Sequence, residues 1–420
     1  MPATDTFERH ATSVRRFIEA QTPALSPSTS DGPSAQAAEQ TFNELALGLF
    51  RLQFEHVPPY RRFCESLRRV PGQVARWTEI PSVPTRAFQE LEFSSLPEAE
   101  RTTVFHSSGT TAHRPSRHFH NAASLALYEA SLWPWFRAHL LADLDNGGVG
   151  DKVTAGGPTL ACASEIDGIR MSPVARTSIR VLFLSPPPTR VPHSSLVHMF
   201  EVIRRRLEGA EPCYVGEVAR TGAWVLDFER VKSLLASACA QRHPLALLGT
   251  AFSFVHLLDR LTEGNLRFGL PPGSRVMETG GYKGRSRGLA QTELHALITD
   301  RLAIPASHIV GEYGMSELSS QAYDRAITAS GWGRVGRGGA NVQRCYHFPP
   351  WARGQVVSPE TDREVADGKM GLMRIVDLAN TRSVLAVQTD DVGRRHGLGF
   401  ELIGRAAPSE PRGCSLLAAP

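Results

Sequence analysis

Charge of one sign, cysteine and long apolar runs are all scarce in this sequence, and each scarcity excludes a class of protein. The formal net charge of +4 is small for 420 residues, which gives no reason to expect a nucleic-acid or anionic-membrane partner. The six cysteines are too scattered for a disulfide framework, so we expect a reduced, cytoplasmic protein. The best apolar run, Pro244 to Leu258, is too short for a membrane span, and the first residues lack the apolar stretch of a secretory signal.

Composition predicts four segments along the chain. Residues 1–40 combine a short charged helix with a Pro- and Ser-rich linker, and residues 41–100 form a helical segment that opens with an amphipathic helix. Residues 101–403 alternate short apolar strands with amphipathic helices, which predicts an α/β domain with much parallel sheet. Residues 404–420 are expected to be a mobile tail that carries a cysteine. Ligands of such α/β domains bind in loops beyond the carboxyl ends of the strands.

The first candidate site is a hydroxyl-rich loop that follows a short β-like run. Its residues are Ser107, Ser108, Gly109, Thr110 and Thr111. Hydroxyls and backbone N–H groups of such a loop can surround phosphate oxygens, and Arg114 and Arg117 could add positive charge. An ordinary Ser/Thr turn is the alternative interpretation. The sequence contains no GK[ST] pattern, so P-loop NTPase chemistry is disfavoured.

Two further candidate sites contain acids. In the segment 311–317, Gly314 lets the backbone approach a ligand, Tyr313 offers a stacking face, and Glu317 could hold Mg²⁺. The alternative is a strand-to-helix turn with Ser316 as its cap. Asp391 lies in an acidic pair expected at a loop, where it could bind ribose hydroxyls or a metal; a solvated turn is the alternative.

Cys414 lies six residues from the end of the chain, beside Arg412 in a Pro- and Gly-containing tail. An exposed thiol next to a cation has thiolate character and is a candidate nucleophile, whereas an incidental tail cysteine is the alternative. Two other patterns are discounted. The GxGxxG at 331–336 lacks a preceding strand and a following helix, and the GxSxG at 284–288 lacks the strand that a nucleophile elbow requires. Without an HExxH, CxxC or EF-hand pattern, no metal site built by the protein alone is expected.

Five motifs in a fixed order carry a resemblance to a known family. They are FHSSGTT (105–111), GTAFSFVHLLD (249–259), ETGGYKGRSR (278–287), GEYGMSELSSQAYD (311–324) and RGCSLL (412–417). From about residue 40 onwards the sequence resembles the acyl-protein synthetase family, the fatty-acid-activating component of bacterial bioluminescence fatty acid reductase. That family is a branch of the adenylate-forming superfamily. The resemblance implies a large adenylate-forming domain with layered, partly parallel sheets, a helical N-terminal segment and a truncated C-terminal lid domain.

The resemblance also implies a reaction. ATP and a fatty or other carboxylic acid form an acyl-adenylate and pyrophosphate in the presence of Mg²⁺. A protein cysteine then takes the acyl group as a thioester and delivers it to a partner such as an acyl reductase or a carrier. Two alternatives remain open at this point: transfer of the acyl group to coenzyme A or a free carrier, and a nucleotide-binding scaffold without activity.

Matched positions carry implied roles around ATP. Residues 107–111 would hold the phosphates, Ser316 would contact the α-phosphate, and Glu317 would bind Mg²⁺. Asp391 would bind the ribose. The resemblance places Cys414 at the acylated cysteine. The residues implied on the adenine side are Gly280, Gly281, Tyr313 and Gly314.

The sequence departs from the superfamily pattern at several positions. Ala112 stands where a Gly follows the two threonines, and the Lys expected downstream of the loop is absent, with Arg117 nearby. The hinge motif reads Gly-Arg-Ala-Ala over 404–407, without its Asp, and the lid domain with its catalytic Lys is missing. The candidate replacement cations are Lys283, Arg285 and Arg405.

Overall fold

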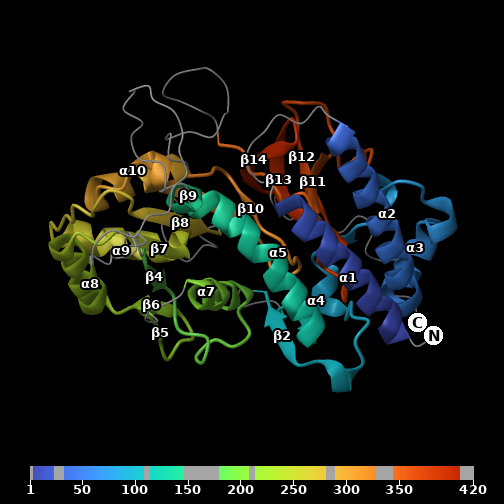
Figure 1. Ribbon diagram of the computed structural model, residues 1–420, viewed down its shortest axis with the longest axis horizontal. Helices are drawn as coiled ribbons and strands as arrows, with labels where there is room; N and C mark the ends of the chain where they lie inside the picture. The colour runs from blue at the N-terminus through green and yellow to red at the C-terminus, as the bar shows by residue number, and fades with distance from the viewer. Residues whose placement is uncertain are drawn as a thin grey trace, which may run out of the picture.

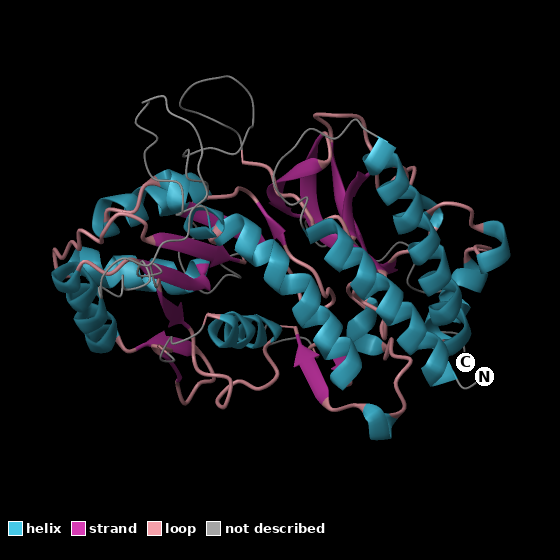
Figure 2. Cartoon of the chain, in the orientation of Figure 1, coloured by secondary structure: helices cyan, strands magenta, loops and turns pink. Residues whose placement is uncertain are grey.

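A computed structural model describes residues 3–22, 33–107, 114–145, 179–207, 213–280, 289–327 and 344–406. Two sheets form the centres of two halves, with helix α5 (Ala122–Leu140) running between them (Figures 1 and 2). One half contains a mostly parallel sheet, and the other contains a mostly antiparallel sheet covered by N-terminal helices. The predicted mixed α/β architecture is thereby confirmed.

The first sheet has the order β10-β9-β8-β7-β4. Its parallel strands are β4 (Arg180–Leu184), β7 (Leu245–Thr250), β8 (Arg275–Thr279) and β9 (Ile309–Tyr313), and β10 (Ala322–Tyr323) joins antiparallel. Strands β8 and β9 are buried along their whole length, as expected for strands covered on both faces. The helices of this half are α6 (Ala142–Asp145), α7 (Ser195–Arg206), α8 (Phe228–Gln241), α9 (Ala251–Glu263) and α10 (Gln291–Leu302).

Two apolar cores fix this sheet between helices. Leu247 and Val276 pack with side chains of α8, α9 and α10, such as Phe254. Leu248 and Met277 point to the opposite core, which contains side chains of α5 and α7. Successive strand residues point to opposite faces, so each face of the sheet packs against helices. A ligand can then bind at the carboxyl ends of the strands.

The second sheet has the order β1-β13-β12-β11, with β14 also paired to β13. Its strands are β1 (Val83–Pro84), β11 (Ala352–Val357), β12 (Met370–Asp377), β13 (Ala386–His396) and β14 (Gly399–Arg405). Strands β11, β12 and β13 each pair antiparallel with the next strand in the sequence. Two smaller hairpins are β2 (Thr103–His106) with β3 (Arg117–His120), and β5 (Gly216–Val218) with β6 (Trp224–Leu226).

N-terminal helices cover the second sheet. They are α1 (Ala3–Gln21), α2 (Pro33–His56), α3 (Pro58–Ser66) and the short α4 (Ala87–Glu90). Phe42 and Phe50 of α2 share a core with Met373, Ile375 and Leu385 of the sheet region. Helix α2 begins at Pro33, inside the segment expected to be a linker, since Pro is well tolerated at the first helical position. Within the described ranges, none of the helices combines the length and hydropathy that crossing a bilayer requires.

Candidate functional site

The carboxyl ends of β8 and β9 form the centre of the candidate site. Thr279 at the end of β8 lies opposite Glu312 on β9, and its hydroxyl donates a hydrogen bond to the Glu312 carboxylate. Gly280 follows in the left-handed region (φ 71°), where glycine is favoured. A side chain on Gly314 would place its Cβ 2.4 Å from a carboxylate oxygen of Glu312, so that carboxylate would have to shift to admit it. Gly280 and Gly314, two of the predicted adenine-side residues, thus lie at neighbouring strand ends.

Tyr313 and Asp391 connect the two sheets at this edge. The Tyr313 hydroxyl donates to Asp391 Oδ2 over 2.9 Å, and Arg405 Nε donates to Asp391 Oδ1 over 3.0 Å. Burial, and then the Asp391 carboxylate, raise the pKa of Tyr313 far above its usual range, so the phenol keeps its proton. The Tyr313 ring meets Phe400 edge-on, with ring centroids 5.4 Å apart. A hydrogen bond therefore joins Tyr313 to Asp391, which lies 78 positions further along the sequence.

The acidic pair lies within strand β13, not in the loop that the sequence analysis expected. Asp390 is paired with Arg86 through an Nε–Oδ2 contact of 2.9 Å, and Asp391 is paired with Arg405. The alternative of a turn is also wrong, because both acids lie in this strand, where each has a cationic partner. The predicted cation candidate Arg405 is thus engaged with the predicted ribose-binding acid.

Ser316 lies where the loop after β9 approaches strand β2. Its hydroxyl donates to the main-chain oxygen of His106 over 3.1 Å, and its Oγ lies 3.5 Å from the hydroxyl of Ser195. The segment 314–321 leads into strand β10 rather than into a helix, so the interpretation of Ser316 as a helix cap is wrong. His106 directly precedes Ser107, whose Oγ accepts a hydrogen bond from the Ser116 N–H. Ser316 therefore lies beside the entrance of the hydroxyl-rich loop.

Glu317 is buried and held at both its main chain and its side chain. Its Oε1 accepts a hydrogen bond of 2.8 Å from the Ser116 hydroxyl and lies 3.7 Å from His118 Nε2. The side-chain amide of Asn380 donates to the Glu317 main-chain oxygen over 2.8 Å. Burial alone would raise the pKa of Glu317, but the contacts with His118 and Ser116 outweigh it and lower that pKa.

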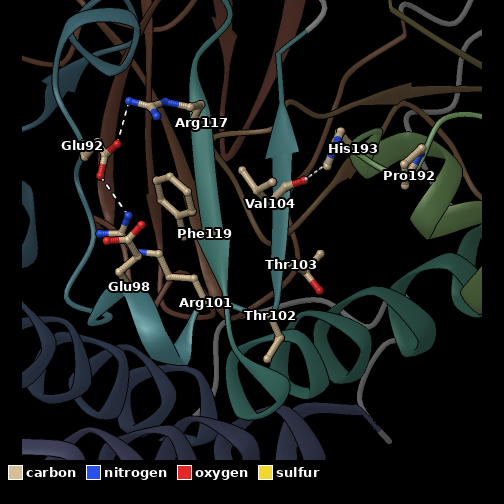
Figure 3. Close-up of a pocket in the computed structure, with 10 residues that line it drawn as sticks. All are labelled: Glu92, Glu98, Arg101, Thr102, Thr103, Val104, Arg117, Phe119, Pro192 and His193. Atoms are coloured by element: carbon tan, nitrogen blue, oxygen red, sulfur yellow. Dashed lines mark hydrogen bonds and ion pairs between the residues drawn. The ribbon is translucent and has the colours of Figure 1, made fainter.

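A cavity of about 620 Å³ lies on the face of the β2–β3 hairpin that carries Val104 and Phe119 (Figure 3). Glu92 bridges two cations there, with contacts of 2.9 Å to Arg101 and 2.6 Å to Arg117. The Arg101 guanidinium lies 4.2 Å from the centre of the Phe119 ring. Arg117, expected to add charge at the phosphate loop, is thus paired with a carboxylate that it shares with Arg101.

The cavity also borders a stacked pair of histidines near the loop. His193 lines it, and its ring stacks on the His106 ring with centroids 4.6 Å apart. Burial is the main cause that lowers the pKa of His106, and the neighbouring His193 adds to it.

Sequence reasoning missed Ser116, His118 and His193. The alternation in Ser-Arg-His-Phe-His over 116–120 was the available signal for the first two, since residues 116, 118 and 120 are buried and 117 and 119 are not. Nothing in the sequence indicated that this face meets Glu317, which lies 201 positions from Ser116.

Several predicted residues lie outside the described residues. They are Ser108, Gly109, Thr110, Thr111, Ala112, Gly281, Lys283, Arg285 and Cys414, together with both discounted glycine motifs. Within the part of the chain that is described, no three His, Cys, Asp or Glu side chains gather as a metal cluster.

Comparison with solved structures identifies the class of the fold. The chain superimposes on 2-hydroxyisobutyryl-CoA ligase in the postadenylation state with 2-HIB-AMP, with a TM-score of 0.57, 13% identity, and coverage of 91% of this chain and 70% of that chain. An open conformation of that ligase with 2-HIB-AMP and CoA gives a TM-score of 0.55, 15% identity, and coverage of 87% and 70%. The fold is therefore that of the adenylate-forming ligases.

Sequence comparison adds a match to one family model and to one curated relative. The model of the family described as "Acyl-protein synthetase, LuxE" matches residues 214–419. A curated relative, the long-chain-fatty-acid–luciferin-component ligase of Aliivibrio fischeri, is 24% identical over 203 residues, which cover 46% of this chain and 49% of the relative. The match thus spans about half the length of that relative. Residues 214–419 are thus similar to the acyl-protein synthetase family, which confirms the resemblance noted in the sequence.

Proposed function

We propose that this protein activates a carboxylic acid with ATP as an acyl-adenylate and transfers the acyl group to its own Cys414. The observation that carries this proposal is the meeting of four separate segments at one edge of the parallel sheet. Tyr313 joins Asp391 there, while Ser316 approaches the start of the hydroxyl-rich loop. This edge is where ligands of open α/β sheets bind.

Each group in the proposed site has a chemical task. Asp391 accepts hydrogen bonds from the ribose, and Tyr313, Gly314, Gly280 and Gly281 surround the adenine. The hydroxyls and N–H groups of residues 107–111, with Ser316, donate to the phosphates. These donors stabilise the charge that develops on phosphorus during attack.

Glu317 fits Mg²⁺ even though no cluster of acids surrounds it. Mg²⁺ is commonly held by one or two carboxylates together with substrate phosphates and water, so one acid beside a phosphate loop is sufficient. The net lowering of the pKa of Glu317 keeps this carboxylate ionised despite its burial. When bound, the metal would neutralise phosphate charge.

The proposed chemistry has two steps that balance. A carboxylate oxygen of the acid attacks the α-phosphorus of ATP, the bond to the bridging oxygen breaks, and pyrophosphate leaves. The Cys414 thiolate then attacks the acyl carbon, a thioester forms, and AMP leaves with the electron pair of the broken C–O bond. Because the thiol must be reduced and ATP is consumed, we place the protein in the cytoplasm.

The name of the curated relative contains a long-chain fatty acid, which supports a fatty acid as the substrate of this protein. An acyl reductase is our proposal for the partner that receives the acyl group. A long-chain acid is therefore the first compound to test. The acyl group on Cys414 would be the form handed to the partner.

Labelling separates this proposal from its alternatives. Protein incubated with ATP, Mg²⁺ and radiolabelled long-chain fatty acid should acquire label that hydroxylamine removes. Cys414→Ser should lose the label but retain acid-dependent exchange of pyrophosphate into ATP, whereas Cys239→Ser, in helix α8, should behave as the wild type. Undiminished label in Cys414→Ser would overturn the transfer step. Rapid acyl-CoA formation by that variant would instead identify a coenzyme A ligase, and absence of pyrophosphate exchange in the wild type would overturn the activation step.

A further inference from the structure

We propose that Ser116 and His118 are positioning residues that fix the Glu317 carboxylate in the orientation used during adenylation. This inference rests on the proposed function, because it gives Glu317 its role beside Mg²⁺ and the phosphates. It adds two residues that the family motifs do not include. Neither residue touches the proposed ligands; both act through Glu317.

The first support is a continuous chain of polar contacts. His118 Nε2 lies 3.2 Å from Ser116 Oγ, and the Ser116 hydroxyl donates to Glu317 Oε1 over 2.8 Å. His118 Nε2 also lies 3.7 Å from the same Oε1. Ser116 therefore bonds one carboxylate oxygen of Glu317, and His118 lies beside both the Ser116 hydroxyl and that oxygen.

The second support is burial. Ser116, His118 and Glu317 are 1%, 3% and 6% exposed. A carboxylate at such a position loses water as a partner, so it is stable there only if protein donors replace that water. The Ser116 hydroxyl is a donor of this kind, and His118 Nε2 lies within hydrogen-bond distance of that hydroxyl.

The third support is that the donors are themselves held in place. The His118 ring packs against Phe88 of α4, with centroids 5.0 Å apart, and Phe88 packs against Phe93 at 4.8 Å. Ser116 and His118 lie on the same face of the hairpin because side chains two positions apart on a strand point the same way. Asn380 fixes the main chain of Glu317 from the other side. The carboxylate is thus oriented before any nucleotide binds, which is the arrangement that gives a metal-binding group its precision.

The same strand provides a matched control. His120 is also buried, at 7% exposure, and its Nδ1 lies 3.2 Å from the hydroxyl of Ser124. This pair repeats the His–Ser contact two residues further along β3, but its hydrogen bond leads to helix α5 and not to Glu317. His118→Gln and His120→Gln therefore remove equally buried rings with different consequences for Glu317.

The test measures metal binding and adenylation separately in the full-length protein. Mn²⁺ affinity is measured by electron paramagnetic resonance in the presence of a non-hydrolysable ATP analogue, and pyrophosphate exchange gives kcat and the KM for Mg²⁺. We expect His118→Gln and Ser116→Ala to weaken Mn²⁺ affinity and raise the KM for Mg²⁺ by about tenfold or more, in the range seen for residues that orient metal ligands. Ser116→Thr, which keeps the hydroxyl, should restore both values, and His120→Gln should leave them unchanged.

Thermal unfolding distinguishes positioning from general damage. Equal losses of Mn²⁺ affinity in His118→Gln and His120→Gln, in step with their melting temperatures, would overturn the inference. So would wild-type Mn²⁺ affinity in both His118→Gln and Ser116→Ala. A wild-type protein without acid-dependent pyrophosphate exchange would instead overturn the proposed function itself, so the two failures are distinguishable.

Discussion

Glu312 offers the sharpest test of the electrostatics at the strand ends. Its carboxyl group is 5% exposed, it accepts a hydrogen bond from Thr279, and Glu278 lies near enough to repel it. Burial is the largest cause that raises the pKa of Glu312 from 4.5 to about 7, and the charge of Glu278 adds to it. The folded protein therefore binds a proton at Glu312 more tightly than the unfolded chain does.

The sign and size of the effect on stability follow from this difference. Between pH 4.5 and about 7 the folded state holds the proton that the unfolded state has lost, so stability falls as the pH rises. Each pKa unit corresponds to about 1.4 kcal/mol, so the loss between pH 5 and pH 8 is roughly 2 to 3 kcal/mol. Glu312→Gln keeps the shape and a hydrogen-bonding group but has no charge to bury, so it should lose this part of the pH dependence.

Urea unfolding of wild type and Glu312→Gln at pH 5 and pH 8 measures the effect as a difference between two curves. Other titrating groups contribute equally to both proteins and cancel. We expect the variant to gain roughly 2 to 3 kcal/mol relative to the wild type between the two pH values. Glu360→Gln, at an exposed position before strand β12, is the control and should leave the curve unchanged. Parallel curves for wild type and Glu312→Gln would refute the reasoning.

Three further predictions concern stability, each measured as the free energy of unfolding in urea. Arg275→Met removes the buried guanidinium that contacts both Asp143 carboxylate oxygens, so it should lower the free energy of unfolding by about 3 to 5 kcal/mol. Arg86→Ala breaks a half-exposed ion pair and should lower it by less than about 1 kcal/mol. Equal losses in the two variants would contradict this prediction. Gln53→Leu leaves two main-chain oxygens and one main-chain N–H without their buried partner, so it should lower the free energy of unfolding by about 3 kcal/mol. An unchanged free energy of unfolding would contradict this prediction. Trp351→Phe opens space in the core and removes the hydrogen bond of 2.7 Å from the indole N–H to Ser131. We expect the free energy of unfolding to fall by about 2 kcal/mol. An unchanged midpoint of urea unfolding would contradict this.

Local patterns in the sequence predicted much of the fold and part of the site. Tyr313 ends strand β9 and Gly280 directly follows strand β8, so both lie at the carboxyl ends of strands, where ligands of α/β domains were expected to bind. Asp391 was misplaced because two adjacent acids resemble a turn. Arg86, the partner of Asp390, lies 304 positions away from it, a contact that no local pattern reveals.

Ser116 and His118 were not predicted from the sequence for a related reason. A strand of four residues such as β3 is too short for its alternation to stand out, and its importance depends on Glu317 far along the chain. Helix α2 was expected to start later, because a Pro- and Ser-rich segment resembles a linker even where Pro33 opens a helix.

The shared core between α2 and the antiparallel sheet bears on where this chain can be divided. The family match covers residues 214–419, but β1, β4 and the helices that cover β11–β14 lie outside it. A fragment cut at residue 214 would lose β4, the neighbour of β7, and expose an unpaired buried strand edge. It would also expose Met373, Ile375 and Leu385, which pack with Phe42 and Phe50 in the intact protein. We therefore expect that the region matched by the family model does not fold on its own and that it needs the N-terminal helices.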